Sequence, residues 1–511
     1  MNELSKKIPE SHESLILVKG DISGIQEFIF NVKSKRAAQS LKGRSFFVKI
    51  LAEVAIQCLF DKFNVPVEKR REFRISTSGG NFYIKLPSAS NPDVLITSTQ
   101  LSLTKSLRYS GLNLSLNFVE LVDSEYCNCL QNLNKKVRES KLKLYAELSI
   151  AEFEEIFAPK DKELYTRIDN NEYWIPITER VKSSRYFTIS QGNFRQDLKL
   201  NQDSIELMGY RCLFHNTQTE SQKIQLDNYL ESIFPSYIEG KKQGQTIEFE
   251  DLARKKGCGA EKLGILKMDV DNLGTNLEKL TSIEEHKSFD EELRKFFNSV
   301  LKEIIYSEFE NEIYTVTAGG DDSFFVGNWR IILELAEKIQ SKFSNYPYFR
   351  SKDLTISAGY IIVSPKFPVV RFSQLAENAI QKAKYKYSKG NICIFDEVVS
   401  WNLFKETQEF KAILGHGVSS KSKGLLAKAR QSAIRGIEDD VVTLKENWEM
   451  SYFLRDCDKQ DVVEKIRTII KANLNKSVTI QNSNAINQLN KRAYRLILPI
   501  AARLKELEMR N

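Results

Sequence analysis

The 511-residue sequence contains little proline and little glycine, with 11 and 23 residues respectively. This scarcity excludes collagen-like and low-complexity chains, which need these residues in quantity. No stretch approaches the roughly 18 uninterrupted apolar residues of a membrane-spanning helix. The start of the chain, MNELSKKIPESHESL, is polar and lacks the apolar core of a signal peptide. We therefore expect a cytoplasmic protein with no membrane partner.

Cysteine is also scarce. The seven cysteines are an odd number and lie scattered along the chain, unlike the framework of a disulfide-rich secreted protein. The remaining composition, 41% hydrophobic and 28% charged, is that of a globular protein. Its length predicts roughly three or four domains at about 150 residues each. The net charge of +8 permits nucleotide or nucleic-acid partners without demonstrating them.

The most informative feature is an internal repeat. Each half of the chain contains an apolar run that ends at an aspartate, an amphipathic stretch, a hairpin signal with Gly-Gly between two β-rich runs, a helical pattern and a further strand-like run. In the first half these segments are 15–30, 43–63, 73–87, 92–108 and 112–121, and in the second 263–280, 289–309, 313–327, 328–343 and 354–363. The order β-α-α-β-β-α-β is typical of a ferredoxin-like fold with an inserted helix. Chance recurrence of such hairpins is the alternative to a duplicated fold.

The rest of the chain differs in character from the two repeats. The region between them mixes short helical and strand signals with polar segments such as EGKKQGQ, whereas the last part shows apolar residues at helical spacing. We therefore predict an α+β protein with five parts. These are a flexible N-terminus (1–14), a first ferredoxin-like domain (15–149), an inserted linker domain (150–262), a second ferredoxin-like domain (263–401) and a C-terminal helical domain (402–511).

The sharpest local signal is the GGDD segment, Gly319, Gly320, Asp321 and Asp322. In a ferredoxin-like sheet, Asp269 ends the strand that runs beside this hairpin. The three carboxylates can hold one or two Mg²⁺ or Mn²⁺ ions, which polarise a nucleotide α-phosphate and lower the pKa of an attacking hydroxyl. An ordinary polar turn is the alternative for a lone GGDD. The DVDNLG segment about fifty residues upstream, in the right strand order, favours the metal site.

The two repeats are chemically unequal. Where the second repeat has GGDD, the first has Gly79, Gly80 and Asn81, with no acidic residue. The first repeat retains only Asp21, which corresponds to Asp269 of the second. One repeat can therefore bind metal, whereas the other can hold only a nucleotide or a backbone. This asymmetry suits the joining of two nucleotides, one of which supplies the activated phosphate and the other the 3′-hydroxyl.

Residues 376–396, which lie after the GGDD segment in the chain, are predicted to contain a helix with several lysines. A lysine that faces the carboxylate hairpin can neutralise triphosphate oxygens as a point charge. For three of these lysines we prefer the alternative of a solvated helix face: Lys382, Lys386 and Lys389.

Six motifs occur together in this order: GDISGIQEFIF, SLKGRSFF, SGGNFYIKLP, LGILKMDVDNLG, AGGDDSFFVG and LTISAGYIIV. Through them the chain resembles the large, polymerase-like subunit of type III CRISPR effector complexes, with the Csm-type branch nearest, over residues 15–120 and 263–400. The resemblance implies two palm domains of the nucleotide cyclase-like kind and the synthesis of cyclic oligoadenylates from ATP when target RNA binds. It also implies guide RNA and other effector subunits as partners.

The same resemblance implies roles for individual residues. Asp269, Asp321 and Asp322 would be catalytic and would bind the metal with the backbone carbonyl of Val270. Lys384 lies where related diguanylate cyclases place a phosphate-binding lysine, in the pattern A-x-x-A-x-x-x-A-K. The remaining nucleotide-binding residues would be Gly319, Gly320 and Asn272, and, in the acceptor pocket of the first palm, Ser23, Gly24, Gly79 and Gly80.

The chain departs from this family in two respects. Many members begin with an HD nuclease domain, but none of the four histidines is followed by aspartate, so we expect no HD nuclease activity. Members also often carry a zinc-binding insertion between the palms. The available ligands here, Cys212, His215 and Cys258, have poor spacing for a structural zinc site. We favour a degenerate zinc-ribbon-like region over a zinc-binding one.

Three basic runs can contact RNA phosphates or partner subunits, although a solvated helix face is the commoner role of such runs. They are residues 33–44, 135–143 and 491–495.

Other activities stay open. The same active site can transfer AMP from ATP to S-adenosylmethionine. A catalytically silent assembly scaffold is a second alternative, which the clustered acids disfavour. A free-standing nucleotide cyclase is a third, and it fits the unequal palms and the helical C-terminal domain less well.

Overall fold

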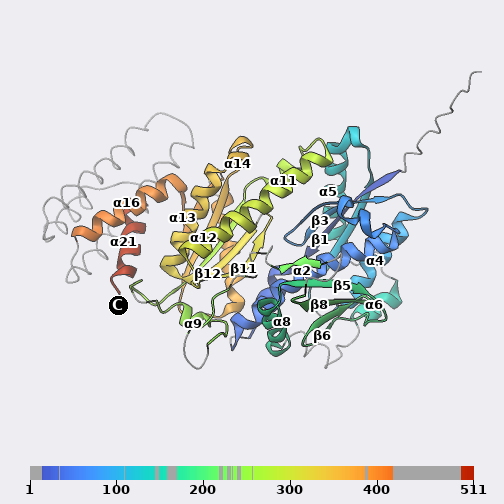
Figure 1. Ribbon diagram of the computed structural model, residues 1–511. Helices are drawn as coiled ribbons and strands as arrows, with labels where there is room; N and C mark the ends of the chain where they lie inside the picture. The colour runs from blue at the N-terminus through green and yellow to red at the C-terminus, as the bar shows by residue number, and fades with distance from the viewer. Residues whose placement is uncertain are drawn as a thin grey trace, which may run out of the picture. The chain divides into compact units, whose positions relative to one another are not determined.

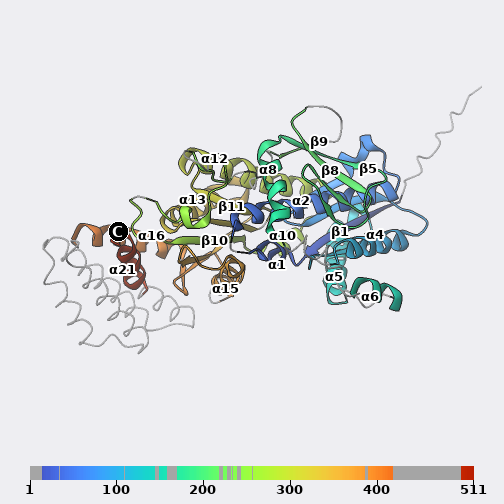
Figure 2. The ribbon, with the colours of Figure 1, turned by 90° about the horizontal axis from the view of Figure 1, so that it is seen from below.

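In the computed structural model, the described residues are 14–510 except 34, 109, 144–148, 158–169, 218–222, 227–228, 230–231, 233, 239–242, 256, 321, 386–388 and 418–495. The predicted flexible N-terminus, Asp321 and most of the predicted C-terminal helical domain thus lie largely or wholly outside the described residues. The chain forms two compact units. The first contains residues 1–232, 272–300 and 318–321, and the second contains 233–271, 301–317 and 322–511. The predicted α+β class is confirmed by the helices and sheets of both units (Figures 1 and 2).

The first palm is a four-stranded antiparallel sheet in the first unit, with strand order β2-β3-β1-β4. Its strands are β1 (Leu15–Ser23), β2 (Arg74–Ser78), β3 (Asn81–Pro87) and β4 (Asn113–Glu120). The helices around it are α1 (Ile25–Phe30), α2 (Ala37–Lys62), α3 (Arg70–Phe73), α4 (Pro92–Ser106) and α5 (Tyr126–Leu142). Gly79 and Gly80, both at positive φ, form the two-residue turn between β2 and β3. The helices and strands predicted in this half are confirmed.

A second sheet in this unit, with order β6-β7-β8-β5-β9, comes from the predicted linker. Its strands are β5 (Tyr186–Gln191), β6 (Lys199–Leu200), β7 (Ser204–Leu207), β8 (Tyr210–His215) and β9 (Lys223–Gln225), and its helices are α6 (Ile150–Phe157) and α8 (Asn171–Ser183). Helix α8 packs closely on α2, because Gly43 has no side chain. A Cβ there would lie 2.4 Å from the carbonyl oxygen of Trp174.

Two helices from the second repeat also belong to the first unit. They are α10 (Leu273–Leu277), which begins within the DVDNLG segment, and α11 (Ile283–Lys295), which follows it. Helix α11 contacts the first palm through Arg294, whose guanidinium donates to the carbonyl oxygen of Thr77 at 3.1 Å. The segment after the DVDNLG motif therefore forms part of the surroundings of the first palm.

The second palm is a six-stranded sheet in the second unit, with order β11-β12-β10-β13-β14-β15. Its strands are β10 (Leu263–Val270), β11 (Ile313–Gly319), β12 (Asp322–Asn328), β13 (Ile356–Val363), β14 (Asn391–Ile394) and β15 (Glu397–Ser400). The helices of this unit are α9 (Phe249–Leu252), α12 (Leu301–Glu308), α13 (Trp329–Asn345), α14 (Pro347–Ser351), α15 (Phe372–Tyr385), α16 (Trp401–Gly417) and α21 (Ile497–Glu508). Among the described residues, no helix is long and apolar enough to cross a lipid bilayer.

The two palm sheets repeat each other residue by residue. In the first, Asp21 of β1 pairs with Asn81 of β3 and Ser115 of β4; in the second, Asp269 of β10 pairs with Asp322 of β12 and Ser357 of β13. The predicted duplication is therefore confirmed. The register also refines the comparison of the hairpins, because it places Asn81 at the position of Asp322.

Candidate functional site

Two carboxylates lie opposite each other at the ends of adjacent strands in the second palm. Asp269 on β10 is in register with Asp322 on β12, and like charges in this arrangement repel. The ammonium of Lys384, in the last turn of α15, forms an ion pair with Asp269. One lysine against two carboxylates leaves a net negative charge, and carboxylate oxygens are the ligands that Mg²⁺ prefers. These residues therefore fit a divalent cation.

Helix α15 brings Lys384 to Asp269 because it packs closely on the sheet. Gly359 of β13 allows this approach, since a Cβ there would lie 2.5 Å from the backbone nitrogen of Ile380. A second ion pair joins the same elements: the buried Lys267 of β10 lies 2.5 Å from a carboxylate oxygen of Glu377 on α15. The two ion pairs have opposite polarity along the helix, so they fix its direction and register on the strand.

Asp271, which the sequence analysis did not assign, is a buried structural carboxylate. It is 1% exposed and accepts hydrogen bonds from the hydroxyls of Thr355 (2.7 Å) and Ser357 (2.9 Å) and from the backbone N–H of Gly390 (2.9 Å). These contacts tie the end of β10 to the start of β13 and to Gly390, the residue before β14. Asp271 thus fixes the end of β10, the strand that carries Asp269.

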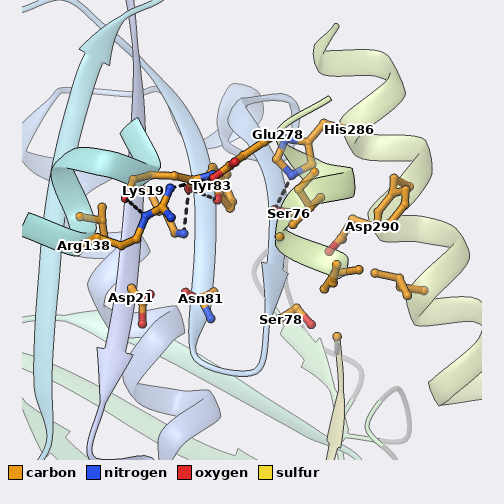
Figure 3. Close-up of a pocket in the computed structure, with 18 residues that line it drawn as sticks. Lys19, Asp21, Ser76, Ser78, Asn81, Tyr83, Arg138, Glu278, His286 and Asp290 are labelled. Carbon is orange, nitrogen blue, oxygen red and sulfur yellow. Dashed lines mark hydrogen bonds and ion pairs between the residues drawn. The ribbon is translucent and has the colours of Figure 1, made fainter. Parts of the chain in front are cut away.

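The first palm contains a pocket of about 300 Å³, on the face of its sheet that carries Lys19 and Asp21 (Figure 3). Strands β1 to β3, helices α5, α10 and α11, and Gly320 enclose it. The lining residues are Lys19, Asp21, Ser76, Ser78, Asn81, Tyr83, Asn134, Val137, Arg138, Leu273, Gly274, Leu277, Glu278, His286, Phe289, Asp290, Leu293 and Gly320. Most of these side chains are polar or charged, and the apolar ones are Val137, Leu273, Leu277, Phe289 and Leu293.

A hydrogen-bonded network forms one wall of this pocket (Figure 3). The amide oxygen of Asn134 accepts hydrogen bonds from the ammonium of Lys19 at 2.9 Å and from the hydroxyl of Tyr83 at 2.7 Å. The carboxylate of Glu278 accepts from the amide of Asn134 at 3.2 Å and from the guanidinium of Arg138 at 3.0 Å. The network fixes these polar groups in position before any ligand arrives.

The opposite wall carries two titratable groups with altered pKa values. Burial, aided by the charge of Lys19, lowers the pKa of His286 to about 4. His286 hydrogen-bonds the hydroxyl of Tyr126 at 2.7 Å and that of Ser76 at 3.3 Å. Burial raises the pKa of Asp290 to about 6, and its partner Arg294 opposes this shift. At neutral pH the imidazole of His286 is therefore uncharged, whereas Asp290 is mostly ionised and forms an ion pair with Arg294 at 2.7 Å.

The four residues predicted to hold the acceptor nucleotide are not in the lining of this cavity, and their role stays a prediction. Among the described residues that line the pocket, Ser23, Gly24, Gly79 and Gly80 do not appear. They shape the strand ends instead: the Ser23 hydroxyl donates to the carbonyl oxygen of Asn113 at 3.4 Å, and the carbonyl of Gly80 accepts from the backbone of Ile22 at 3.0 Å. The sequence indicated the hairpin but not which face of the sheet would be hollowed.

The other predicted residues have different surroundings. Gly320 lines the pocket, and Gly319 ends β11. Val270 is the last residue of β10. Asn272 adopts a left-handed conformation and begins α10. Asp321 lies outside the described residues, so its predicted role as a metal ligand stays a prediction.

The two zinc candidates of the first unit do not point to the same side of their strand. Strand β8 places Cys212 and His215 on opposite faces, because they are three residues apart and side chains alternate along a strand. Cys212 is buried, which raises the pKa of its thiol, whereas His215 contacts Thr217. Cys258 belongs to the second unit. In the part of the chain that the structure describes, no three His, Cys, Asp or Glu side chains form a metal-binding group.

The basic run at 33–44 differs from expectation only in its last part, because Lys33, Lys35 and Arg36 are exposed. Lys42 and Arg44 of α2 are 0% and 1% exposed, so neither can reach an RNA phosphate. Arg44 donates to the carbonyl oxygen of Phe28 at 3.0 Å and lies over the rings of Phe28 and Trp174. Its guanidinium is a core element that joins α1, α2 and α8.

Two family models match the chain. Residues 14–160 match the Csm1 subunit domain B, and residues 262–393 match the second palm domain of Cas10/Cmr2. The two matches include both palm sheets apart from strand β15. The second match contains the Asp269, Asp322 and Lys384 site.

Curated relatives are similar along most of the chain. Two are named CRISPR system single-strand-specific deoxyribonuclease Cas10/Csm1 (subtype III-A). The protein of Methanocaldococcus jannaschii is 25% identical over 78% of this chain and 61% of its own length. That of Enterococcus italicus is 23% identical over 76% of this chain and 55% of its own length. The chain therefore spans somewhat more than half the length of these relatives.

Solved structures share the fold. A Csm1–Csm4 cassette without ligand matches 96% of this chain and 70% of its own, with a TM-score of 0.70 at 18% identity. Cassettes in complex with cA3 and with one ATP match with TM-scores of 0.69 and 0.68. Both family models and the curated relatives therefore agree that the chain is similar to Cas10/Csm1 proteins, most clearly over its two palm domains.

Proposed function

We propose that this chain is the large subunit of a type III CRISPR effector complex and synthesises cyclic oligoadenylates from ATP at its second palm. The observation that carries the proposal is the pair Asp269 and Asp322, level on adjacent strands, with Lys384 ion-paired to Asp269. Solved Csm1–Csm4 cassettes in complex with ATP, cA3 and cA4 support it by their fold and ligands.

In the proposed reaction, the 3′-oxygen of one nucleotide bonds to the α-phosphorus of another. The bond from that phosphorus to the bridging oxygen breaks, pyrophosphate leaves, and the hydroxyl proton passes to solvent. A divalent cation bound by Asp269 and Asp322 would supply Lewis-acid polarisation of the phosphate. Lys384 would hold phosphate oxygens by charge-assisted hydrogen bonds. Glu377 and Asp271 would keep Lys384 and Asp269 in place.

The partners of this chain belong to the same proposal. One solved relative is a Csm1–Csm4 subcomplex of the type III-A CRISPR-Csm interference complex. We infer that the chain likewise assembles with other effector subunits and guide RNA, and that it meets target RNA only through them. The absence of HD nuclease activity stays a prediction, and so do the five domain boundaries.

Mass spectrometry of the products made from ATP by the RNA-loaded assembly tests the proposal. The wild type should form cyclic oligoadenylates, Asp321→Ala with Asp322→Ala should form none, and Asn81→Ala should only lower the yield. A parallel reaction with S-adenosylmethionine detects an AMP conjugate instead. Equal products from the double variant and the wild type would refute the proposal, and no product at all would favour a scaffold.

A further inference from the structure

The first palm contains an ion-pair arrangement that no proposed role yet explains. Lys19 and Asp21 lie two residues apart on β1 and point to the same face of the sheet. Both meet helix α5: the ammonium of Lys19 donates to Asn134 at 2.9 Å, and the ammonium of Lys141 lies 2.7 Å from a carboxylate oxygen of Asp21. The two helix residues are seven positions apart, which is two turns of an α-helix.

The second palm has the same arrangement at its candidate active site. Lys267 and Asp269 lie two residues apart on β10, and they meet Glu377 and Lys384, which are seven residues apart on α15. Lys141 is therefore the counterpart of Lys384, the lysine expected to bind phosphate. The correspondence comes from contacts and strand register within each unit, and it does not depend on any alignment.

Two replacements reverse the charge of the first-palm cluster. Asn81 takes the place of Asp322, and Asn134 takes the place of Glu377. The second-palm cluster has two lysines against three carboxylates. The first-palm cluster, which Arg138 and Glu278 border, has three cations against two carboxylates: Lys19, Arg138 and Lys141 against Asp21 and Glu278. The first therefore favours an anion and the second a cation.

We propose that the first palm holds a phosphate group of a nucleotide directly on Lys141 and Arg138, without a divalent cation. An ammonium carries three N–H donors and a guanidinium five, so each can bind an anion while it keeps its carboxylate partner. Asp21 is already paired with Lys141, and Asn81 offers a neutral amide where the second palm has the negatively charged carboxylate of Asp322.

The pocket next to this cluster is the space in which the rest of the ligand would lie. Asp21, Asn81 and Arg138 line the cavity of about 300 Å³, so an anion on Lys141 lies at its edge. The side chain of Lys141 is 35% exposed and that of Arg138 is 70% exposed, and both are open to a ligand from solvent. That the ligand is a nucleotide rests on the proposed function, whereas the anion site itself rests on these contacts.

Calorimetric titration of the full chain with inorganic tripolyphosphate in EDTA tests the site. Lys141→Glu should weaken binding by about tenfold or more, since charge-assisted hydrogen bonds are lost and repulsion is added. Lys135→Glu, the same charge change at an exposed position of α5, should stay within about twofold of the wild type. Lys384→Glu is measured in the same way, so that binding at the second palm is counted separately.

Equal binding by the Lys141→Glu and Lys135→Glu variants would overturn the site, as would wild-type binding that vanishes in EDTA. If Lys141→Glu lowers the Tm, the milder pair Lys141→Gln with Arg138→Gln replaces it. Asn81→Asp gives an independent measurement, because it restores the second carboxylate. Electron paramagnetic resonance should then count one more bound Mn²⁺ than in the wild type, and an unchanged count contradicts the cation-free site.

These results are separable from those of the proposed function. If the assembly forms products from ATP but substitution of Lys141 leaves the tripolyphosphate affinity unchanged, the anion site alone is excluded. If tripolyphosphate binding depends on Lys141 but the assembly forms no product from ATP, the anion site is supported and the proposed function is excluded.

Discussion

At the scale of single residues, similar side chains have opposite roles according to their surroundings. Lys42 and Arg44 come from a basic run but are buried in the core, whereas Lys384 and Lys382 are close neighbours on α15 with different partners. Lys384 pairs with Asp269 at the candidate site, and Lys382 pairs with the exposed Asp396. This contrast supplies a matched control for the lysine.

Lys384→Gln should raise the KM for ATP by about tenfold or more, because a charge-assisted phosphate contact is lost. Lys382→Gln removes the same charge two residues away and should leave KM within about twofold, since its ion pair is exposed. Initial rates over a range of ATP concentrations measure both. Equal KM values for the two variants would exclude a phosphate contact at Lys384.

The buried pair on α11 makes stability depend on pH in two opposite ways. The unfolded His286 takes up a proton near pH 6.5 and the folded one only near 4, so its contribution is present above 6.5 and is lost toward 4. Asp290 titrates near 3.8 when unfolded and about 6 when folded, so its contribution is lost as pH rises toward 6. His286→Gln should therefore flatten the acid-side fall of Tm between pH 6.5 and 4. Parallel Tm curves of the variant and the wild type would contradict this assignment.

At the scale of elements, the site depends on where helix α15 lies on its sheet. The helix is placed by the close approach at Gly359 and by the ion pair of Lys267 with Glu377. Loss of either contact would shift Lys384 without changing Lys384 itself. Asp271 joins the end of β10 to β13 and to Gly390.

Asp271→Ala should lower the free energy of unfolding of the second unit by about 3 kcal/mol, because a buried carboxylate with three hydrogen-bond donors is removed. Asp271→Asn keeps the volume and one acceptor oxygen, and should cost less. Urea unfolding followed by the fluorescence of the buried Trp329 measures both. If the alanine variant is as stable as the asparagine variant, Asp271 does not hold these elements together.

At the scale of the whole molecule, the sequence predicted what local motifs determine. The Gly-Gly turns and the duplicated order of elements follow from short segments, and the structure confirms them. The predicted strand end is off by one residue at Asp269 and by two at Asp21, because β10 continues to Val270 and β1 to Ser23. The hydrogen bonds of Asp271 were missed because their partners lie 84 to 119 residues away in the chain. No local pattern records such contacts.

The hollow in the first palm was missed for a related reason. Its walls include α10 and α11, which belong to the second repeat in sequence but to the first unit in space. The sequence contained one signal that α5 of the first palm corresponds to α15 of the second. Asn134 and Lys141 are seven residues apart, as are Glu377 and Lys384. It becomes visible only once the two helices are matched through their strands.

The central claim is that Asp269 and Asp322 form the site of nucleotide joining. The most direct measurement is the rate of pyrophosphate release from ATP by the RNA-loaded assembly. Asp269→Asn and Asp322→Asn should each lower it by about 100-fold or more. Asp396→Asn, the same change at an exposed acid of the second palm, should leave it within about twofold. Comparable rates for all three variants would contradict the account.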